Sequence, residues 1–256
     1  MTVFRRLSSP FYLLISLIAG FPIGAQADYH IRSPNEIDLS SWEFEHNGAA
    51  SFDRKAEKNG ESSETIEVGG GVTSWWQPEF ELGFARQPGP DQRTRVDGVV
   101  WENVIRLTEP GENWADFGLY GEYAWAAQKG VANSTMFGPL IEKEVGPTTH
   151  SFNYFFNKNL GPNQDSHDYT SSYAWQSRWN LSRLFSPAVE FYADAGKLSP
   201  FGDLESQKLL AGPILLGSAL LGSYGKVKYE VGPLFGLTNV SPGTTLRWRL
   251  EWEMHF

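Results

Sequence analysis

The sequence predicts an all-β fold, a transmembrane antiparallel up-and-down β-barrel of about 12 strands. Three observations lead to this prediction: an export signal at the start of the chain, a last segment that alternates strictly between apolar and polar residues, and earlier segments with the same alternation. Aromatic residues make up 14% of the chain, and this abundance favours strands.

The start of the chain has the order of a secretory signal peptide. Arg5 and Arg6 precede an apolar run that ends at Phe21, and an Ala-x-Ala cleavage pattern ends at Ala27. The run has about a dozen residues, whereas a membrane-spanning helix needs about 20. We therefore expect residues 1–27 to be removed and residues 28–256 to form one barrel domain in the outer membrane of a Gram-negative bacterium.

The last segment, from Thr245 onward, predicts the closing strand. One face carries charged side chains, and the other consists of Leu246, Trp248, Leu250, Trp252, Met254 and Phe256. Alternation with a period of two indicates a strand with one apolar and one polar side. A soluble β-sandwich is the alternative. The signal peptide and the terminal Phe256 favour the barrel, because outer-membrane barrels typically end on an aromatic residue that serves as a signal to the barrel-assembly machinery.

Segments of about ten residues with the same alternation recur along the chain, separated by turn residues. The clearest segments are Trp42–Glu45, Glu79–Phe84, Val99–Leu107, Trp114–Trp125, Asp168–Trp179 and Gly225–Leu237. Weaker ones are Ser63–Val72, Ser134–Glu144, Thr149–Asn157, Pro187–Gly196 and Leu209–Leu221, the last of which is apolar on both faces. With the closing strand the count is 12, and 10 and 14 strands are the alternatives. An even count places both termini on the periplasmic side and the longer odd-numbered connections outside.

Composition excludes several functional classes. The chain has no cysteine, which excludes disulfide scaffolds, thiol nucleophiles and Cys-ligated metal sites. Its 30 acidic and 21 basic residues give a formal net charge of -9, which argues against nucleic-acid binding. A mean hydropathy of -0.36 argues against a helical membrane bundle.

The strand phases predict an acidic lumen. The inward carboxylates are expected to be Glu43, Glu45, Glu67, Glu79, Glu81, Glu102, Asp116, Glu122, Glu190, Asp194, Glu230, Glu251 and Glu253. The inward basic groups are expected to be Arg106, Arg178, Lys228, Arg247 and Arg249. Closure would bring Arg247 and Arg249 beside the first strand, so cross-strand ion pairs are expected there. An excess of negative charge should favour cations over anions in a pore, and a plugged interior that serves only packing is the alternative.

Catalytic and metal signals are weak. Barrel hydrolases typically carry a His-x-Ser pair on one strand, and none of the five histidines is followed by serine two residues later. Asp165-Ser166-His167-Asp168 is most simply a solvated loop, and His150 and His255 are interpreted as interfacial polar residues. With only three Met and no histidine cluster, a soft-metal site is not supported. We expect no enzyme activity, cofactor or metal, and a lipid-acting barrel enzyme is the alternative.

Motifs in the second half of the chain resemble those of a known group. They are Tyr120–Tyr123, Phe137–Pro147 with Thr149–Asn153, Tyr173–Arg178, Lys228–Gly232, Phe235–Thr238 and Leu246–Trp252. The chain resembles a group of little-characterised proteobacterial outer-membrane proteins similar to those encoded with phenol meta-pathway genes. This resemblance implies an exported, porin-like barrel with a transport role, and suggests aromatic or other catabolic substrates. It carries no catalytic residues. The expected partners are outer-membrane lipid, the barrel-assembly machinery and a small-molecule solute.

Overall fold

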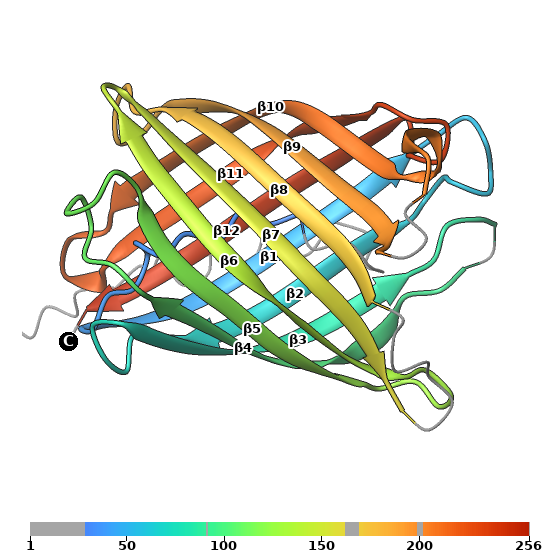
Figure 1. Cartoon of the computed structure of the whole chain (residues 1–256), viewed down its shortest axis with the longest axis horizontal. Helices are drawn as coiled ribbons and strands as arrows, with labels where there is room; N and C mark the ends of the chain where they lie inside the picture. The colour runs from blue at the N-terminus through green and yellow to red at the C-terminus, as the bar shows by residue number, and fades with distance from the viewer. Residues whose placement is uncertain (1–28, 91, 162–168, 199–201, 256) are drawn as a thin grey trace, which may run out of the picture.

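The computed structural model describes residues 29–90, 92–161, 169–198 and 202–255, and they form one closed antiparallel β-barrel (Figure 1). The strands are β1 (Ser41–Phe52), β2 (Ser62–Gly69), β3 (Trp76–Arg86), β4 (Arg95–Arg106), β5 (Asp116–Ala126), β6 (Asn133–Val145), β7 (Thr148–Leu160), β8 (Tyr169–Trp179), β9 (Ser186–Lys197), β10 (Lys208–Leu220), β11 (Lys226–Gly236) and β12 (Thr244–His255). Two short 3₁₀ helices, η1 (Leu204–Ser206) and η2 (Gly222–Tyr224), lie in connections. Within the described ranges, no helix has the length and apolar character needed to cross a membrane.

Every strand pairs with its neighbours in sequence, and β1 closes the barrel on β12. The closing register runs from Ser41 opposite His255 to Phe52 opposite Thr244. The predicted fold and the strand count of 12 are therefore confirmed, and the alternatives of 10 and 14 strands are excluded. The expected signal peptide, Phe256 and the Asp165–Asp168 run lie outside the described residues.

The connections divide unevenly between the two ends. We call the end where β1 runs into β2 the loop end, and the end where β12 finishes the terminal end. A long connection, residues 53–61, lies at the loop end, whereas a tight turn at residues 146–147 joins β6 to β7 at the terminal end. The expected asymmetry fails at residues 107–115, a long connection at the terminal end.

The predicted start of β4 was wrong, and a β-bulge explains the error. The strand begins at Arg95 rather than Val99. Its register with β3 shifts between Gly83 and Phe84, which pair with Gly98 and Val96. The extra residue lets Val96 and Val99 both lie exposed on the outer wall although an odd number of positions separates them. A bulge breaks period-two alternation, so the pattern alone placed the start of the strand too late.

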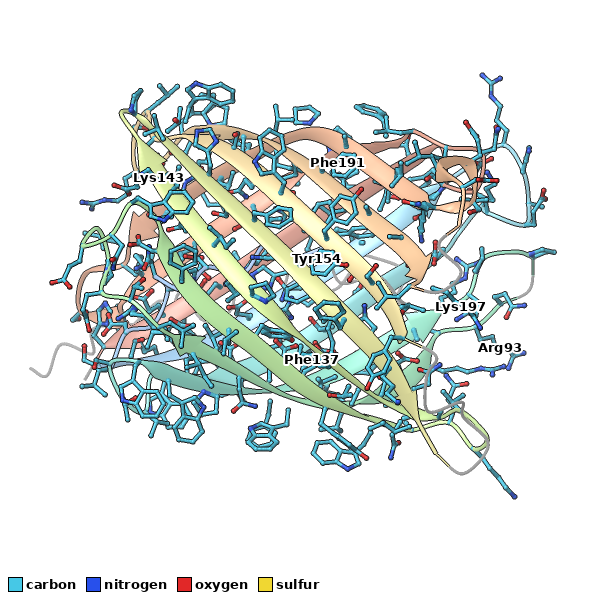
Figure 2. All side chains as sticks on the ribbon, viewed as in Figure 1. Arg93, Phe137, Lys143, Tyr154, Phe191 and Lys197 are labelled. Atoms are coloured by element: carbon cyan, nitrogen blue, oxygen red, sulfur yellow. The ribbon has the colours of Figure 1, made fainter. Side chains whose placement is uncertain are left out.

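The barrel has an apolar outer wall and a largely polar interior. Large apolar side chains such as Trp42, Phe80 and Phe137 are about half exposed on the outside. Figure 2 shows aromatic side chains around the wall, with Phe137, Tyr154 and Phe191 among them. On β12 the inward residues Thr245, Arg247, Arg249 and Glu251 are buried, while the outward residues that alternate with them are partly exposed. The expected alternation of the closing strand is therefore present.

An apolar core lies inside the barrel, where sequence analysis predicted polar groups. Residues Tyr29–Ile37, which we call the luminal segment, run through the interior before β1 begins. Ile31 packs with Tyr192, Leu210, Ile214, Leu216 and Leu234. Ile37 packs with Val104, Tyr120, Leu140 and Phe155. The inner face of β10 is apolar because it packs against the luminal segment, which accounts for a strand that is apolar on both faces.

Candidate functional site: the barrel interior

The barrel wall satisfies the backbone of the luminal segment. Asn153 holds Arg32 from both sides: the backbone N–H of Arg32 donates to Asn153 Oδ1, and Asn153 Nδ2 donates to the carbonyl of Arg32, each at 2.8 Å. Arg106 donates to the carbonyls of Pro34 (3.0 Å) and Ile37 (3.1 Å). A buried segment without regular structure needs such partners, because unpaired backbone groups are costly away from water.

Side chains add specific contacts. The guanidinium of Arg32 lies 2.8 Å from Glu102 and 4.2 Å from the centre of the Tyr120 ring. Asn35 Nδ2 donates to Asp116 (2.7 Å) and Glu142 (3.0 Å). Glu102, Arg106 and Asp116 were predicted to face a lumen, and they do so as anchors of this segment. Sequence analysis missed the segment because it has no periodicity.

Inward residues of β9, β11 and β12 form an arginine-rich network. Arg247 is 1% exposed; it binds both oxygens of Glu190 and lies 2.5 Å from Glu230. Arg249 lies 2.6 Å from Glu45 and 3.0 Å from Glu251. The expected ion pair between the first and last strands is thus present at Arg249, whereas Arg247 pairs with Glu190 of β9 and Glu230 of β11.

Two lysines extend this network. Lys228 lies 2.6 Å from Glu251 and 3.0 Å from Glu253, and Lys226 lies 2.7 Å from Glu253. Bidentate and shared charge-assisted hydrogen bonds of this kind are shorter and stronger than hydrogen bonds between neutral groups. This part of the interior therefore matches the plugged alternative, in which paired charges serve packing.

The carboxylates of β1, β2 and β3 are held mainly by neutral donors. Gln77 Nε2 donates to Glu43 (2.8 Å) and to Glu79 (2.9 Å). Asn47 Nδ2 and Thr65 Oγ1 donate to Glu67 at 2.7 and 2.6 Å. Oxygens of Glu43, Glu45 and Glu79 lie within 4.8 Å of one another, and so do those of Glu67, Glu79 and Glu102.

A cavity of about 520 Å³, which we call the vestibule, occupies the loop end of the interior. Its floor includes Tyr29, His30 and Arg32 of the luminal segment. Its charged lining residues are Glu81, Asp97, Glu102, Glu122, Asp194, Arg32 and Lys208. Acidic groups therefore exceed basic ones. Aromatic rings, among them Phe155 and Tyr192, also line it.

A second, much smaller cavity of about 10 Å³ lies on the other side of His30 and Arg32. It is lined by His30, Arg32, Ser33, Glu36, Ile37, Glu45, Gln77, Glu79, Val104 and Arg249. The luminal segment therefore separates the vestibule from a small enclosed space among carboxylates.

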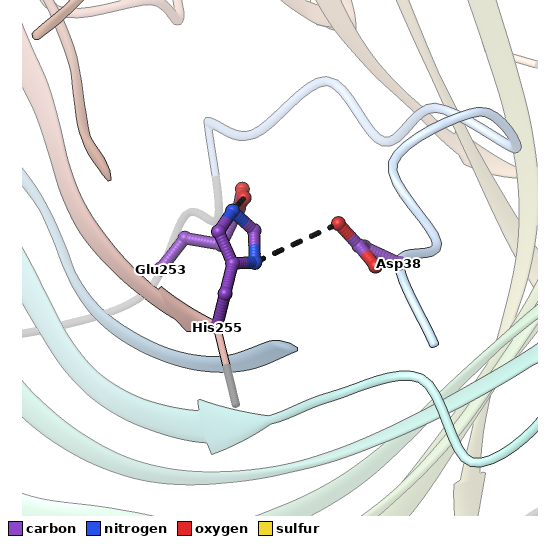
Figure 3. A group of neighbouring side chains, drawn as sticks. All are labelled: Asp38, Glu253 and His255. Atoms are coloured by element: carbon purple, nitrogen blue, oxygen red, sulfur yellow. Dashed lines mark ion pairs between the residues drawn. The ribbon is translucent and has the colours of Figure 1, made fainter. Parts of the chain in front are cut away.

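At the terminal rim, His255 lies between two carboxylates (Figure 3). Its Nε2 is 3.1 Å from Glu253, and its Nδ1 is 3.9 Å from Asp38, which follows the luminal segment. The backbone N–H of Ser40 donates to Asp38 and lowers the pKa of that carboxyl. Arg178, another predicted lumen residue, donates to Asn180 at 2.9 Å near this end.

A serine–histidine pair forms across two strands. His150 Nδ1 lies 2.5 Å from Ser177 Oγ, and its Nε2 lies 3.0 Å from Thr148 Oγ1. A search for His-x-Ser along one strand could not find this pair. Ser177 is only 6% exposed, and the hydrogen-bond partners described for His150 are hydroxyl groups rather than the carboxylate or amide that orients a catalytic histidine. The pair is most simply explained as polar groups that satisfy each other.

Comparison with known proteins adds little to this picture. No protein-family model matches the chain, and no curated protein matches it. Among solved structures, the chain is similar to one titled "Bacterial polysaccharide outer membrane secretin", with 8% sequence identity, a TM-score of 0.36, and coverage of 84% of this chain and 98% of that chain. A likeness this distant carries no argument about function.

Proposed function

We propose that the protein is an outer-membrane channel that admits small cationic or neutral solutes to its vestibule and passes them when the luminal segment moves aside. The observation that carries this proposal is the acid-rich vestibule of about 520 Å³ whose floor is a non-covalently held segment. The passage would be passive, along the solute's concentration gradient.

The outer wall supports a membrane location. Strands of 11 to 13 residues, such as β3, β6 and β12, are long enough to cross a bilayer, which takes about 9–11 residues per tilted strand. Exposed apolar side chains cover the outside, including Trp42, Trp125 and Trp179. Tryptophans of this kind suit the interfaces between lipid and water. Outer-membrane lipid and the barrel-assembly machinery would then be the partners.

The charge of the vestibule supports a preference for cations. Glu81, Asp97 and Glu122 are only partly buried, so solvent reaches them. Carboxylates in a narrow cavity with apolar surroundings raise the local concentration of cations and repel anions. Aromatic rings in the same lining suit solutes with an apolar body, in keeping with the catabolic substrates that the family resemblance suggests.

A closed barrel whose interior serves only structure is the second candidate. The observation that favours it is the buried network around Arg247 and Arg249, together with the packed luminal segment. A lipid-acting enzyme is less well supported, because Ser177 is buried.

Single-channel recording in planar bilayers separates these candidates. We compare the wild type with I31A/I37A, which removes the two apolar anchors of the luminal segment, and with I66A, a matched change on the outer wall. Truncating a buried isoleucine costs about 2–5 kcal/mol, so the double variant should release the segment and raise the open probability at least about tenfold over I66A.

Selectivity then tests the vestibule. E81K/E122K should lower the cation-to-anion permeability ratio of the released channel, while E205K, a charge reversal on an exposed connection outside the vestibule lining, should leave it unchanged. If neither the folded wild type nor I31A/I37A conducts ions, the channel proposal is rejected and the closed structural barrel is favoured.

A further inference from the structure

Three buried carboxylates converge in the interior. Glu43 and Glu45 come from β1 and Glu79 from β3, and one oxygen of each lies within 4.8 Å of the others. All three side chains are buried. Like charges this close and this well shielded from water repel one another strongly, so the arrangement calls for a bound cation or for protonation of the carboxylates.

The described residues compensate only part of this charge. Glu45 pairs with Arg249, whereas Glu43 and Glu79 receive hydrogen bonds from the neutral amide of Gln77 and form no ion pair in the described part of the chain. Among the described residues, Glu43 Oε1 has no hydrogen-bond partner. The cluster thus presents two carboxylates that have no ion-pair partner among the described residues.

An independent feature of the luminal segment points at the same place. His30 is 7% exposed, and in the described part of the chain neither of its ring nitrogens has a hydrogen-bond partner. It lines the cavity of about 10 Å³ together with Glu45, Gln77 and Glu79. Burying a fully unpartnered imidazole is unfavourable unless something binds it.

The cavity and its donors suit one ion. About 10–15 Å³ of this kind of volume holds one water-sized particle. Gln77 Oε1 is buried and also lacks a partner among the described residues. Carboxylate and amide oxygens are ligands of Ca²⁺ and Mn²⁺, and Mn²⁺ also tolerates an imidazole, directly or through a bound water.

We propose that Glu43, Glu45 and Glu79, with Gln77 and His30, bind a single divalent cation of the Mn²⁺ or Ca²⁺ kind. The cation would neutralise the two carboxylates that have no ion pair and would connect the luminal segment to β1 and β3. The site does not depend on conduction, so it can be tested on a barrel that never opens.

The test is a titration of the folded full-length chain in detergent, stripped with EDTA, with Mn²⁺ as the probe. Free Mn²⁺ is read by electron paramagnetic resonance, and thermal unfolding is recorded in parallel. The wild type should bind one Mn²⁺ per chain, Ca²⁺ should displace it, and the metal should raise the Tm.

Substitutions locate the site. E79Q should raise the apparent Kd at least about tenfold, as loss of a group in a metal's coordination environment typically does. E81Q is the matched control, because Glu81 lies on the same strand and lines the vestibule instead. E79D, which keeps the charge, should retain part of the affinity, and H30A should weaken binding. Heat-modifiable electrophoretic mobility verifies that each variant is folded.

Three results would overturn the proposal. One is the absence of saturable Mn²⁺ binding to the folded, stripped wild type, which would mean that protons neutralise the carboxylates. Another is equal weakening by E79Q and E81Q, which would indicate binding elsewhere on the acidic surface. Wild-type affinity in H30A would remove His30 from the site.

Discussion

The two halves of the barrel interior differ in what fills them, although the same strands build both. In the filled half, inward side chains meet the luminal segment and one another, as around Arg247 and Ile37. Toward the loop end, inward side chains such as Glu81 and Glu122 line the vestibule. The inward orientation of a polar residue therefore does not by itself define its role. The residue forms a packed ion pair where another segment of the chain contacts it, and it lines a cavity where none does.

The largest effect should come from breaking the filled half at Arg247. R247M removes the main partner of the buried Glu190 and of the partly buried Glu230, and the loss of one member of a buried ion pair typically costs about 3–5 kcal/mol. Urea unfolding in detergent, followed by tryptophan fluorescence, measures the change in the free energy of unfolding. R183M, on an exposed turn, is the control. A loss no larger than that of the control would mean that the network contributes nothing to stability.

An intermediate effect is expected at Asn153, and it compares the two halves directly. N153L removes both hydrogen bonds to the backbone of Arg32 and leaves those groups buried, at a cost of about 1–3 kcal/mol. Hydrogen exchange of amides in residues 29–37 should then accelerate about tenfold, as 1.4 kcal/mol corresponds to that factor.

The control for Asn153 is the same change four residues along β7. Asn157 lines the vestibule and donates to Ser172 at 3.2 Å. N157L should leave exchange in the luminal segment unchanged. Equally faster amide exchange in N153L and N157L would show that the two halves of the interior do not respond independently.

The smallest effect should come from the loops above the vestibule. Asp53 accepts hydrogen bonds from the backbone N–H of Lys55 (2.8 Å) and Gly243 (2.7 Å), which connects two loops, and these donors lower the pKa of its carboxyl. Because folding lowers the pKa of Asp53, its ionised carboxylate stabilises the folded state. This stabilisation is fully present above the ordinary aspartate pKa of about 3.9 and is lost as the pH falls through the lowered pKa.

D53N should therefore lower the Tm slightly at neutral pH, and the difference from wild type should vanish in strong acid. The Tm of both proteins, measured by thermal unfolding from neutral pH to strong acid, tests this prediction. A difference that persists after Asp53 is protonated would assign the effect to packing rather than to charge.

Much of the wall was predictable from the sequence. Strict alternation placed β12 almost residue for residue. Closure of the barrel predicted ion pairs between the first and last strands, and the pair between Arg249 and Glu45 is one of this kind. These predictions succeed because period-two alternation is a local property of a strand with two different surroundings. The prediction fails at the bulge in β4, because one extra residue reverses which side chains face inward and which face outward.

The contents of the barrel were not predictable in the same way. The luminal segment has no periodicity, and the apolar inner face of β10 gave its only hint. His150 and Ser177 are 27 positions apart and meet only because β7 and β8 pair. Arg247 reaches Glu190 on β9, a partner that closure of the first and last strands did not suggest.

The sequence by itself therefore determined the barrel: its strands, their faces, its closure and the acidic character of its interior. Only the tertiary structure decided which inward groups pair, which line a cavity, and that Tyr29–Ile37 runs through the interior. The physical reason is that the pattern along a strand records whether a side chain faces inward. The partner it meets there depends on distant segments that come together when the barrel closes around them.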